Sequence, residues 1–317
     1  MPDFRHEFPF DPGYGHSLES LLRIEPPQEP EGCADIWRNR YAQALAIDPA
    51  PVLSPPSRQQ GYDCFDLRYQ TTGGLTLGGW LLTPAEGEIR RGLVIGHGYG
   101  GREAPDYDLP VGDAALLFPC FRGLSRSRQP PYSDNPYWHV LHDVDKPDRY
   151  VLRGCVEDLW LAVSALLELF PQVRGHIGYM GISFGGGIGA LAIPWDERIR
   201  IAHLNVPTFG HQPLRLTLPT VGSAASLSAY HRHHPELLET LRFYDAACAA
   251  RHIRIPVHVA AALFDPAVAP PGQFAIYNAL SGPKRLFVLA AGHYDYPGKA
   301  AQDAELRQQL REFFAGL

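Results

Sequence analysis

The stretch from His176 to Ile193 reads His-Ile-Gly-Tyr-Met-Gly-Ile-Ser-Phe-Gly-Gly-Gly-Ile-Gly-Ala-Leu-Ala-Ile. It contains the pattern Gly-x-Ser-x-Gly around Ser183, between an apolar run at 177–180 and a run of small residues at 186–193. A strand that turns sharply into a helix at such a serine forms a nucleophile elbow, which holds the hydroxyl above the sheet edge. The flanking glycines are needed because no Cβ fits between the strand and the helix there. The stretch therefore predicts Ser183 as a nucleophile; the alternative is a glycine-rich turn whose serine has no chemical role.

Strands and helices alternate along most of the chain. Apolar segments of strand length lie at 93–96, 114–120, 177–180, 199–204, 257–263 and 285–290, and helical patterns lie at 150–170, 186–193, 242–252, 272–280 and 300–314. This alternation is typical of an α/β protein with a mostly parallel, doubly wound sheet. Ahead of it, 62–70 and 75–83 are joined by Thr-Thr-Gly-Gly, which predicts a hairpin.

The domain organisation follows from where this alternation starts and where it is interrupted. We expect residues 1–60 to form an arm with a helix at 35–47, packing on a main domain at 61–317. Residues 207–241, after the strand at 199–204, break the alternation and are predicted to be an irregular insertion.

Composition excludes several classes of protein. The 317 residues are 45% hydrophobic and 20% charged, with a formal net charge of −6, whereas a nucleic-acid surface would need a basic stripe. No apolar run is long enough to span a bilayer, and the first residues lack the apolar core of a signal peptide. The cysteines are scattered and form no CxxC pair (Cys33, Cys64, Cys120, Cys155 and Cys248). We therefore expect a cytoplasmic protein with reduced thiols and neither a nucleic-acid nor a membrane partner.

A serine nucleophile requires a base and an acid that orients the base. In hydrolases with such an elbow, the acid and then the histidine follow the serine in chain order, on loops after successive strands. Asp265 and His293 occupy these two positions, so both would emerge at the carboxyl edge of the sheet beside Ser183. We predict His293 as the base and Asp265 as the acid. The alternatives are a loop histidine bonded to backbone, a turn-forming aspartate, and Asp295 or Asp245 as the acid.

The tetrahedral intermediate of such a reaction needs two oxyanion donors. One is expected from the amide after the nucleophile, that of Phe184, and the other from the amide of Tyr99 in the loop after the early strand. Substrate contacts are expected from residues near these groups: Tyr99, Phe184, Arg122 and Pro207. For Arg122 the alternative is that it anchors a loop through a carboxylate.

Two further motifs are set aside. Gly96-x-Gly98-x-x-Gly101 spells a dinucleotide fingerprint, but Pro105 and Pro110 prevent the helix that must follow it. Adjacent histidines at 231–234 lack a cysteine or a pair of acids nearby, so no metal is expected.

Motifs spread over nearly the whole chain resemble those of one family. They are Asp35-Ile36-Trp37, Gly79–Pro84, His97-Gly98-Tyr99, Arg122-Gly123, the Ser183 elbow, Asp265 followed by Pro270-Pro271, and Tyr277–Lys284 ahead of Gly292-His293. Together they resemble the acetyl xylan esterase / cephalosporin-C deacetylase family of carbohydrate esterases, in the α/β-hydrolase superfamily. The segment from Asp265 to Lys284 is the most specific part, since α/β hydrolases in general do not share it.

The resemblance implies a serine esterase that needs no cofactor, removes acetyl groups from small sugars and antibiotic-type esters, and assembles as a homo-oligomer, usually a hexamer. It also implies the roles given above for Ser183, His293 and Asp265. Two positions depart from the family, where Phe184 and Leu124 replace glutamines, which leaves acyl and sugar preference open. The alternatives are a hydrolase of longer esters, lactones or peptides, and a non-catalytic relative that binds ligands.

Overall fold

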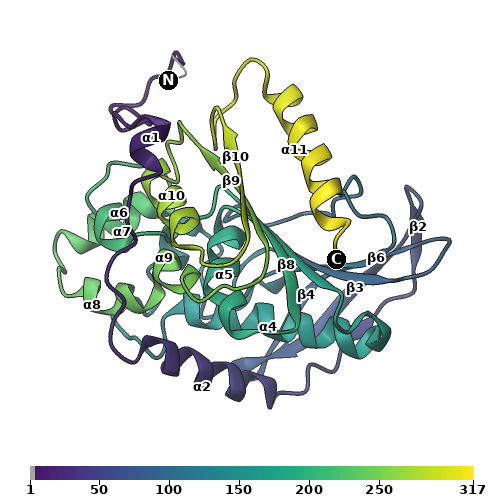
Figure 1. The fold of residues 1–317 in the computed structure, drawn as a ribbon. Coiled ribbons are helices and arrows are strands. Elements are labelled where there is room, and N and C mark those ends of the chain that lie inside the picture. The colour runs from purple at the N-terminus through teal and green to yellow at the C-terminus, as the bar shows by residue number, and fades with distance from the viewer. Residues whose placement is uncertain (1–3) are drawn as a thin grey trace.

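The fold is described from a computed structural model that covers residues 4–317, so the first three residues of the predicted arm lie outside the described residues. Its centre is a sheet with the strand order β1-β3-β4-β6-β5-β7-β8-β9-β10, and β2 pairs with β3 at one end (Figure 1). The strands are β1 (Val52–Leu53), β2 (Ser57–Gln59), β3 (Tyr62–Thr71), β4 (Leu75–Pro84), β5 (Arg91–Gly96), β6 (Ala114–Pro119), β7 (Ile177–Ile182), β8 (Ile199–Asn205), β9 (Val257–Ala262) and β10 (Lys284–Leu289).

The order of pairing divides the sheet into two parts. Strands β5 to β10 pair in parallel, and β1 to β4 join the sheet through antiparallel pairs, with β4 against β6. The predicted hairpin is confirmed as β3 and β4, because their residues pair from Tyr62–Pro84 to Thr71–Leu75. The parallel strands bring the carboxyl ends of β5, β7, β8, β9 and β10 to one edge, where ligands bind in open α/β sheets.

Helices cover the two faces of the sheet unequally (Figure 1). The helices are α1 (Leu18–Leu21), α2 (Cys33–Leu45), α3 (Pro136–His139), α4 (Val151–Leu169), α5 (Phe184–Ala192), α6 (Gln212–Arg215), α7 (Ser223–His231), α8 (Leu237–Leu241), α9 (Ala246–Ala250), α10 (Pro270–Ala279) and α11 (Lys299–Phe314). Side chains of α11 pack on one face, and those of α2, α4, α5, α9 and α10 join the core on the other. The connection from β5 to β6 contains no described helix, because Pro105 and Pro110 interrupt it.

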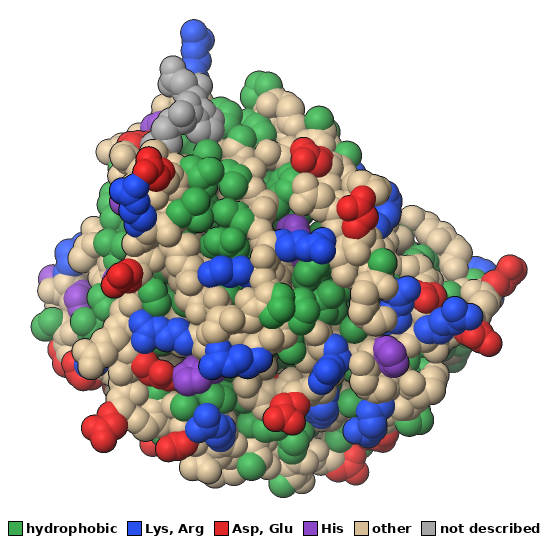
Figure 2. Space-filling view, viewed as in Figure 1, with side chains coloured by type: hydrophobic (Ala, Val, Ile, Leu, Met, Phe, Trp, Pro, Cys, Tyr) green, Lys and Arg blue, Asp and Glu red, His purple; other side chains and the backbone are tan. Residues whose placement is uncertain are grey.

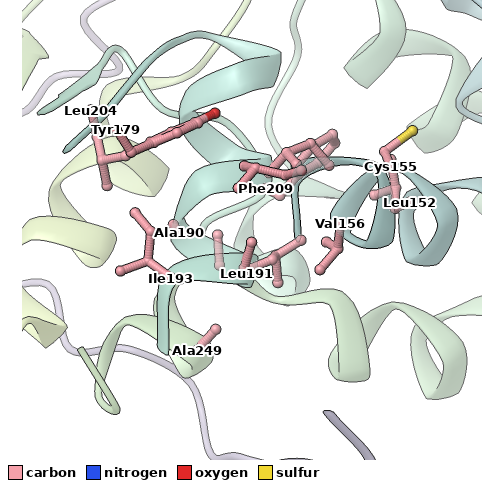
Figure 3. Close-up of a cluster of buried hydrophobic side chains, with 14 of the residues drawn as sticks. Leu152, Cys155, Val156, Tyr179, Ala190, Leu191, Ile193, Leu204, Phe209 and Ala249 are labelled. Atoms are coloured by element: carbon pink, nitrogen blue, oxygen red, sulfur yellow. The ribbon is translucent and has the colours of Figure 1, made fainter. Parts of the chain in front are cut away.

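The main core lies between the sheet and helices α4 and α5 (Figure 3). Val156 of α4 points toward Leu191 of α5, and the fully buried Tyr179 of β7 lies farther from α4, near Leu204. Helix α5 lies unusually close to β7, since a Cβ on Gly189 would come within 2.2 Å of the Tyr179 ring. The small residues after the serine therefore let the elbow helix lie against its own strand.

Two predicted segments differ from the structure. The insertion at 207–241 is not irregular, because it folds into the short helices α6, α7 and α8. The single helix predicted at 242–252 is also wrong: a 3₁₀ turn at Arg242–Tyr244 is followed by α9. Asp245 separates the two, because its carboxylate accepts the Ala247 and Cys248 amides and starts a new helix.

The described surface carries mixed charge. On the face seen in Figure 2, basic and acidic side chains are interspersed without a continuous band of one sign. No helix within residues 4–317 is long and apolar enough to cross a membrane.

Candidate active site

Ser183 stands at the turn between β7 and α5, where the sequence places it. Its φ of 54° and ψ of −109° lie in a region that residues other than glycine rarely adopt. Both pattern glycines are required by close backbone approach: a Cβ on Gly181 would lie 2.6 Å from the Gly185 backbone, and one on Gly185 would lie 2.7 Å from Gly96. The turn is held in place because the Ser183 amide donates to the Asn205 carbonyl at 2.8 Å.

Asp265 and His293 form a hydrogen-bonded line with this serine. Nε2 of His293 lies 2.9 Å from Oγ of Ser183, and Nδ1 lies 2.8 Å from Oδ2 of Asp265. Because a carboxylate only accepts, Nδ1 carries the ring proton and Nε2 accepts the hydroxyl proton of Ser183. This arrangement suits removal of a proton from the serine as it attacks a carbonyl carbon.

The Asp265 carboxylate is fully buried and bonded on both oxygens. Oδ1 accepts the amides of Ala267 and Val268, each at 2.9 Å. Oδ2 accepts Nε2 of Gln273 at 3.0 Å in addition to His293. Gln273 was not predicted from the sequence, since one glutamine inside α10 carries no sequence signal. Its Oε1 also accepts the Ala262 amide, so this side chain ties α10 to the end of β9.

The same carboxylate sets the protonation of the histidine. Burial alone would lower the pKa of His293, but the negative charge of Asp265 and the hydrogen bond to it outweigh burial, so the pKa is raised above 6.5. The neutral ring, which is the form that can accept a proton, therefore predominates only toward the alkaline side of that raised value.

The backbone on the other side of the serine can supply oxyanion donors. Within residues 4–317, the amides of Tyr99 and Phe184 donate to no protein acceptor. The loop that carries Tyr99 is tied to α5, because the Gly185 amide donates to the His97 carbonyl at 2.9 Å. A Cβ on Gly98 would lie 3.8 Å from the Cβ of Ser183, so this loop runs directly past Ser183.

A buried histidine fixes the side chain of Tyr99. Nε2 of His139 lies 2.9 Å from the Arg122 carbonyl, so it donates, and Nδ1 then accepts the Tyr99 hydroxyl at 3.0 Å. Burial lowers the pKa of His139 to about 4, which keeps the ring neutral at physiological pH. The Tyr99 ring also packs at 4.2 Å between ring centroids on Phe184. His139 was likewise not predicted, because it lies 40 residues beyond Tyr99 on a different element.

We expect the His139→Phe substitution to lower kcat by roughly 10- to 100-fold while leaving KM nearly unchanged, because the loop carrying the Tyr99 amide loses its anchor. Kinetics with 4-nitrophenyl acetate would measure both constants. Tyr99→Phe should lower kcat to a similar extent. The double variant should lose no more kcat than the more impaired single variant, because both substitutions remove the same hydrogen bond. His142→Phe, in the same segment, is the matched control. A loss of stability with unchanged kcat would contradict the positioning role.

Phe184 and Pro207, which were also predicted to contact substrate, are buried. The Phe184 side chain is fully buried, with its ring against Phe121 and Phe209 as well as Tyr99, so its side chain packs in the core. Pro207 follows β8 and is buried against α5, where a Cβ on Gly186 would meet it at 3.0 Å. The glutamine-to-phenylalanine departure at position 184 therefore replaces a polar group with a core aromatic ring.

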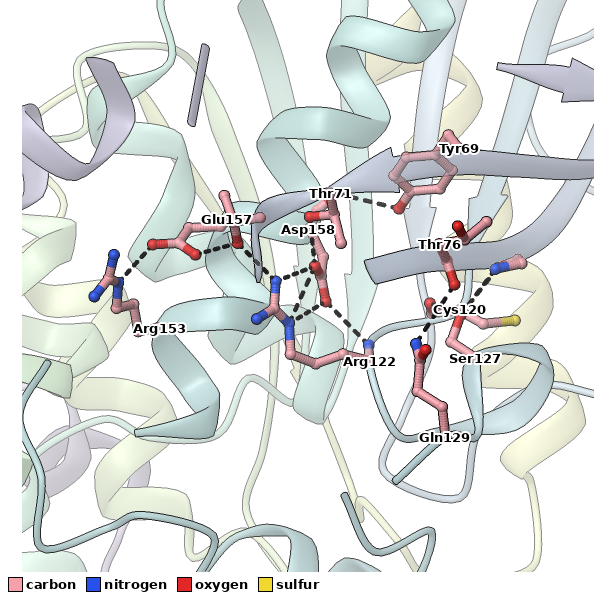
Figure 4. Close-up of polar contacts among 12 residues, drawn as sticks. Tyr69, Thr71, Thr76, Cys120, Arg122, Ser127, Gln129, Arg153, Glu157 and Asp158 are labelled. Carbon is pink, nitrogen blue, oxygen red and sulfur yellow. Dashed lines mark hydrogen bonds and ion pairs between the residues drawn. The ribbon is translucent and has the colours of Figure 1, made fainter. Parts of the chain in front are cut away.

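The Arg122 side chain, predicted to contact substrate, is buried and paired with Asp158 (Figure 4). Its Nη2 lies 2.6 Å from Oδ1 of Asp158, and its Nε lies 3.0 Å from Oδ2 of the same carboxylate. Thr71 donates to Asp158 and Thr72 accepts from Arg122, so each member of the pair has a further polar partner. Both side chains are buried. Arg122 therefore anchors its loop through a carboxylate, which is the alternative given for it in the sequence analysis.

Asp158→Asn should lower the free energy of unfolding by about 3–5 kcal/mol, because it leaves the buried Arg122 cation without its counter-ion. Urea unfolding followed by circular dichroism measures this loss. Asp63→Asn breaks the exposed pair with Arg58 and is the control, for which no change beyond error is expected. Equal effects from the two substitutions would contradict the assigned role of Asp158.

The two rival acids lie elsewhere. The Asp245 carboxylate is engaged by backbone amides, including that of His211 at 3.1 Å, and caps α9. Asp295 is exposed in the loop of His293. Asp265 is therefore the carboxylate that the structure brings to the histidine.

The N-terminal segment packs against the loops that carry Asp265 and His293. Phe4 lies 5.1 Å from Phe264 and 5.8 Å from Tyr294, measured between ring centroids, so one arm contacts the loops of both Asp265 and His293. The Asp265 amide also donates to the Pro12 carbonyl at 3.0 Å. No group of three or more potential metal ligands occurs within residues 4–317, and His234 of the histidine run contacts Glu236 instead.

A largely parallel sheet whose nucleophile elbow, acid loop and histidine loop meet at one edge defines an α/β hydrolase. The chain belongs to the acetyl xylan esterase (AXE1) family, whose model matches residues 17–311. It is therefore a carboxylic-ester hydrolase of the kind that acts on acetyl esters.

Solved structures agree on the fold. The acetyl xylan esterase from Paenibacillus sp. R4 has a TM-score of 0.81 at 20% identity, covering 94% of this chain and 100% of that one. Acetyl xylan esterase 1 from Thermoanaerobacterium sp. JW/SL YS485 has a TM-score of 0.77 at 20% identity, covering 95% and 99%. An acylaminoacyl peptidase from Pyrococcus horikoshii has a TM-score of 0.62 at 16% identity, covering 81% of this chain but 42% of that one.

Proposed function

We propose that this esterase removes acetyl groups from small acetylated substrates, such as sugars, xylo-oligosaccharides and cephalosporin-type esters, through an acyl-enzyme on Ser183. The observation that carries the proposal is the continuous line from Ser183 through His293 to the buried Asp265. The family to which the chain belongs supports the acetyl group as the part removed.

In the proposed mechanism, Oγ of Ser183 attacks the ester carbonyl and passes its proton to Nε2 of His293. The amides of Tyr99 and Phe184 hydrogen-bond the oxyanion of the tetrahedral intermediate. The intermediate collapses, His293 returns the proton to the departing alcohol, and the acetyl group stays on the serine. Water, activated by the same histidine, then releases acetate. Asp265 remains ionised and stabilises the imidazolium in both steps.

The test is hydrolysis of 4-nitrophenyl esters from acetate to octanoate. We expect kcat/KM to be highest for acetate and propionate and to fall with longer chains. Release of acetate from acetylated xylo-oligosaccharides and from a cephalosporin acetyl ester would then rank the natural substrates. A preference for octanoate would overturn the small-acyl part of the proposal, and activity that survives loss of Ser183 would overturn the acyl-enzyme.

A further inference from the structure

The residue directly before Ser183 is a large apolar side chain that remains in contact with solvent. Ile182 is 43% exposed at the end of β7. Side chains alternate between the faces of a strand, so Ile182 points to the same face as Met180, which belongs to the cluster packed against α11. The β5–β6 connection adds no described helix to that face, so a strip of sheet stays open between α11 and the loop at 102–109.

Two cavities on this strip meet at Ile182. The first, of about 320 Å³, is lined by His293 and by the loop that follows it. The second, of about 230 Å³, lies between α11 and the ends of β5, β7 and β8. Ile182, Asn205 and Asp303 line both, so the two cavities adjoin and form one groove, the Ile182 groove. The first cavity alone reaches the size of small-molecule sites, roughly 300–1,000 Å³.

His293 relates this groove to one side of the ester. In the proposed mechanism, His293 returns its proton to the departing alcohol, so the alcohol oxygen must lie within hydrogen-bond reach of Nε2. The carbonyl oxygen is expected on the other side of the serine, at the Tyr99 and Phe184 amides. A groove that begins at His293 therefore suits the alcohol part of the substrate.

The side chains of the Ile182 groove favour an uncharged ligand with an apolar body. The lysine and the arginines that line it are each paired with a carboxylate (Arg102 with Asp106, Arg307 with Asp108, and Lys299 with Asp303). Asp295, at the His293 end, is exposed, so water solvates its charge. Much of the remaining wall of the second cavity is apolar, from Ile95, Leu109, Met180, Leu306 and Leu310. Burial of apolar surface against such a wall stabilises binding.

We propose that the Ile182 groove binds the alcohol part of the ester and selects acetyl esters of uncharged alcohols that carry an apolar chain or ring. The inference rests on the proposed function, because it adds an alcohol subsite to the same active site. It assigns the selection of the alcohol to residues other than those that bind the acetyl carbonyl.

The first part of the test varies the alcohol and keeps the acetyl group constant. Ethyl, hexyl and 2-phenylethyl acetate release primary alcohols of similar leaving ability, so ratios of their kcat/KM values report binding of the alcohol. We expect hexyl and 2-phenylethyl acetate to exceed ethyl acetate by about 10- to 100-fold, because each buried methylene contributes about fourfold. Titration of released acetate at constant pH measures the rates.

The second part changes the walls of the groove. Ile182→Asn should lower the hexyl-to-ethyl ratio by about 5- to 10-fold, and Ile182→Leu should keep it within about twofold. Leu109→Asn lies outside the elbow and should also lower the ratio. Leu45→Asn is the control, because Leu45 has a comparable exposure of 41% at the end of α2, and no change is expected. Thermal melting checks the fold of each variant.

The proposal is overturned if the wild-type ratio is near one, or if folded Ile182→Asn and Leu109→Asn leave it unchanged. It is also overturned if Ile182→Asn alters only the ratio of 4-nitrophenyl octanoate to 4-nitrophenyl acetate, because the groove would then hold the acyl chain. Failure of the proposed function is distinguishable, since it appears as a wild-type preference for octanoate or as hydrolysis that survives Ser183→Ala.

Discussion

The Ser183→Ala variant is expected to hydrolyse 4-nitrophenyl acetate with kcat lowered by about a millionfold, the loss found when a hydrolase of this kind loses its nucleophile. The reason is local: Oγ of Ser183 is the atom that Nε2 of His293 reaches at 2.9 Å. The fold should persist, because alanine keeps the Cβ and every backbone bond of the elbow. Steady-state kinetics would measure the loss of kcat, and circular dichroism would test whether the fold persists.

A direct test of the acyl-enzyme accompanies this variant. Rapid quenching of the wild-type enzyme with 4-nitrophenyl acetate, followed by peptide mass spectrometry, should find one acetyl group on the peptide that contains Ser183. The same peptide from Ser183→Ala should carry none. An acetyl group on another residue, together with turnover by the variant, would contradict the proposed nucleophile.

Asp265→Asn is expected to lower kcat by about 10⁴-fold, because the amide cannot hold the His293 ring in the required tautomer or stabilise the imidazolium. Gln273 worsens the loss, since its Nε2 donates to the same oxygen and would oppose an amide NH₂ placed there. Kinetics with 4-nitrophenyl acetate measure the effect. Asp295→Asn, an exposed aspartate in the His293 loop, is the control and should retain wild-type kcat.

The pH profile separates the charge of Asp265 from its packing. The proposed mechanism requires neutral His293, so kcat/KM is expected to fall as the pH drops through the raised pKa of this ring, above 6.5. Without the Asp265 charge, burial acts alone and lowers the pKa, so the acid limb of the variant should move to lower pH. An acid limb that stays in place in Asp265→Asn would contradict the coupling of the two residues.

The sequence alone predicted the parts of this protein that depend on neighbouring residues in the chain. The Gly-x-Ser-x-Gly pattern requires a tight turn, and both glycines are needed at contacts of 2.6–2.7 Å. The order serine, aspartate, histidine after successive strands predicted which side chains meet, because parallel strands end at one edge. Short-range periodicity predicted the positions of strands and helices. The prediction was wrong in segment 207–241, where the periodicity is weak and the structure has short helices.

The tertiary structure decided what depends on contacts between distant segments. Gln273 on the acid, His139 on Tyr99 and the Arg122–Asp158 pair each join elements that the chain separates, and their residue types are ordinary in loops and helices. The burial of Arg215 is a property of packing around α6, which no local pattern encodes. Local steric rules thus determined the elbow and the order of its partners, whereas long-range packing determined which polar groups became buried and which residues they contact.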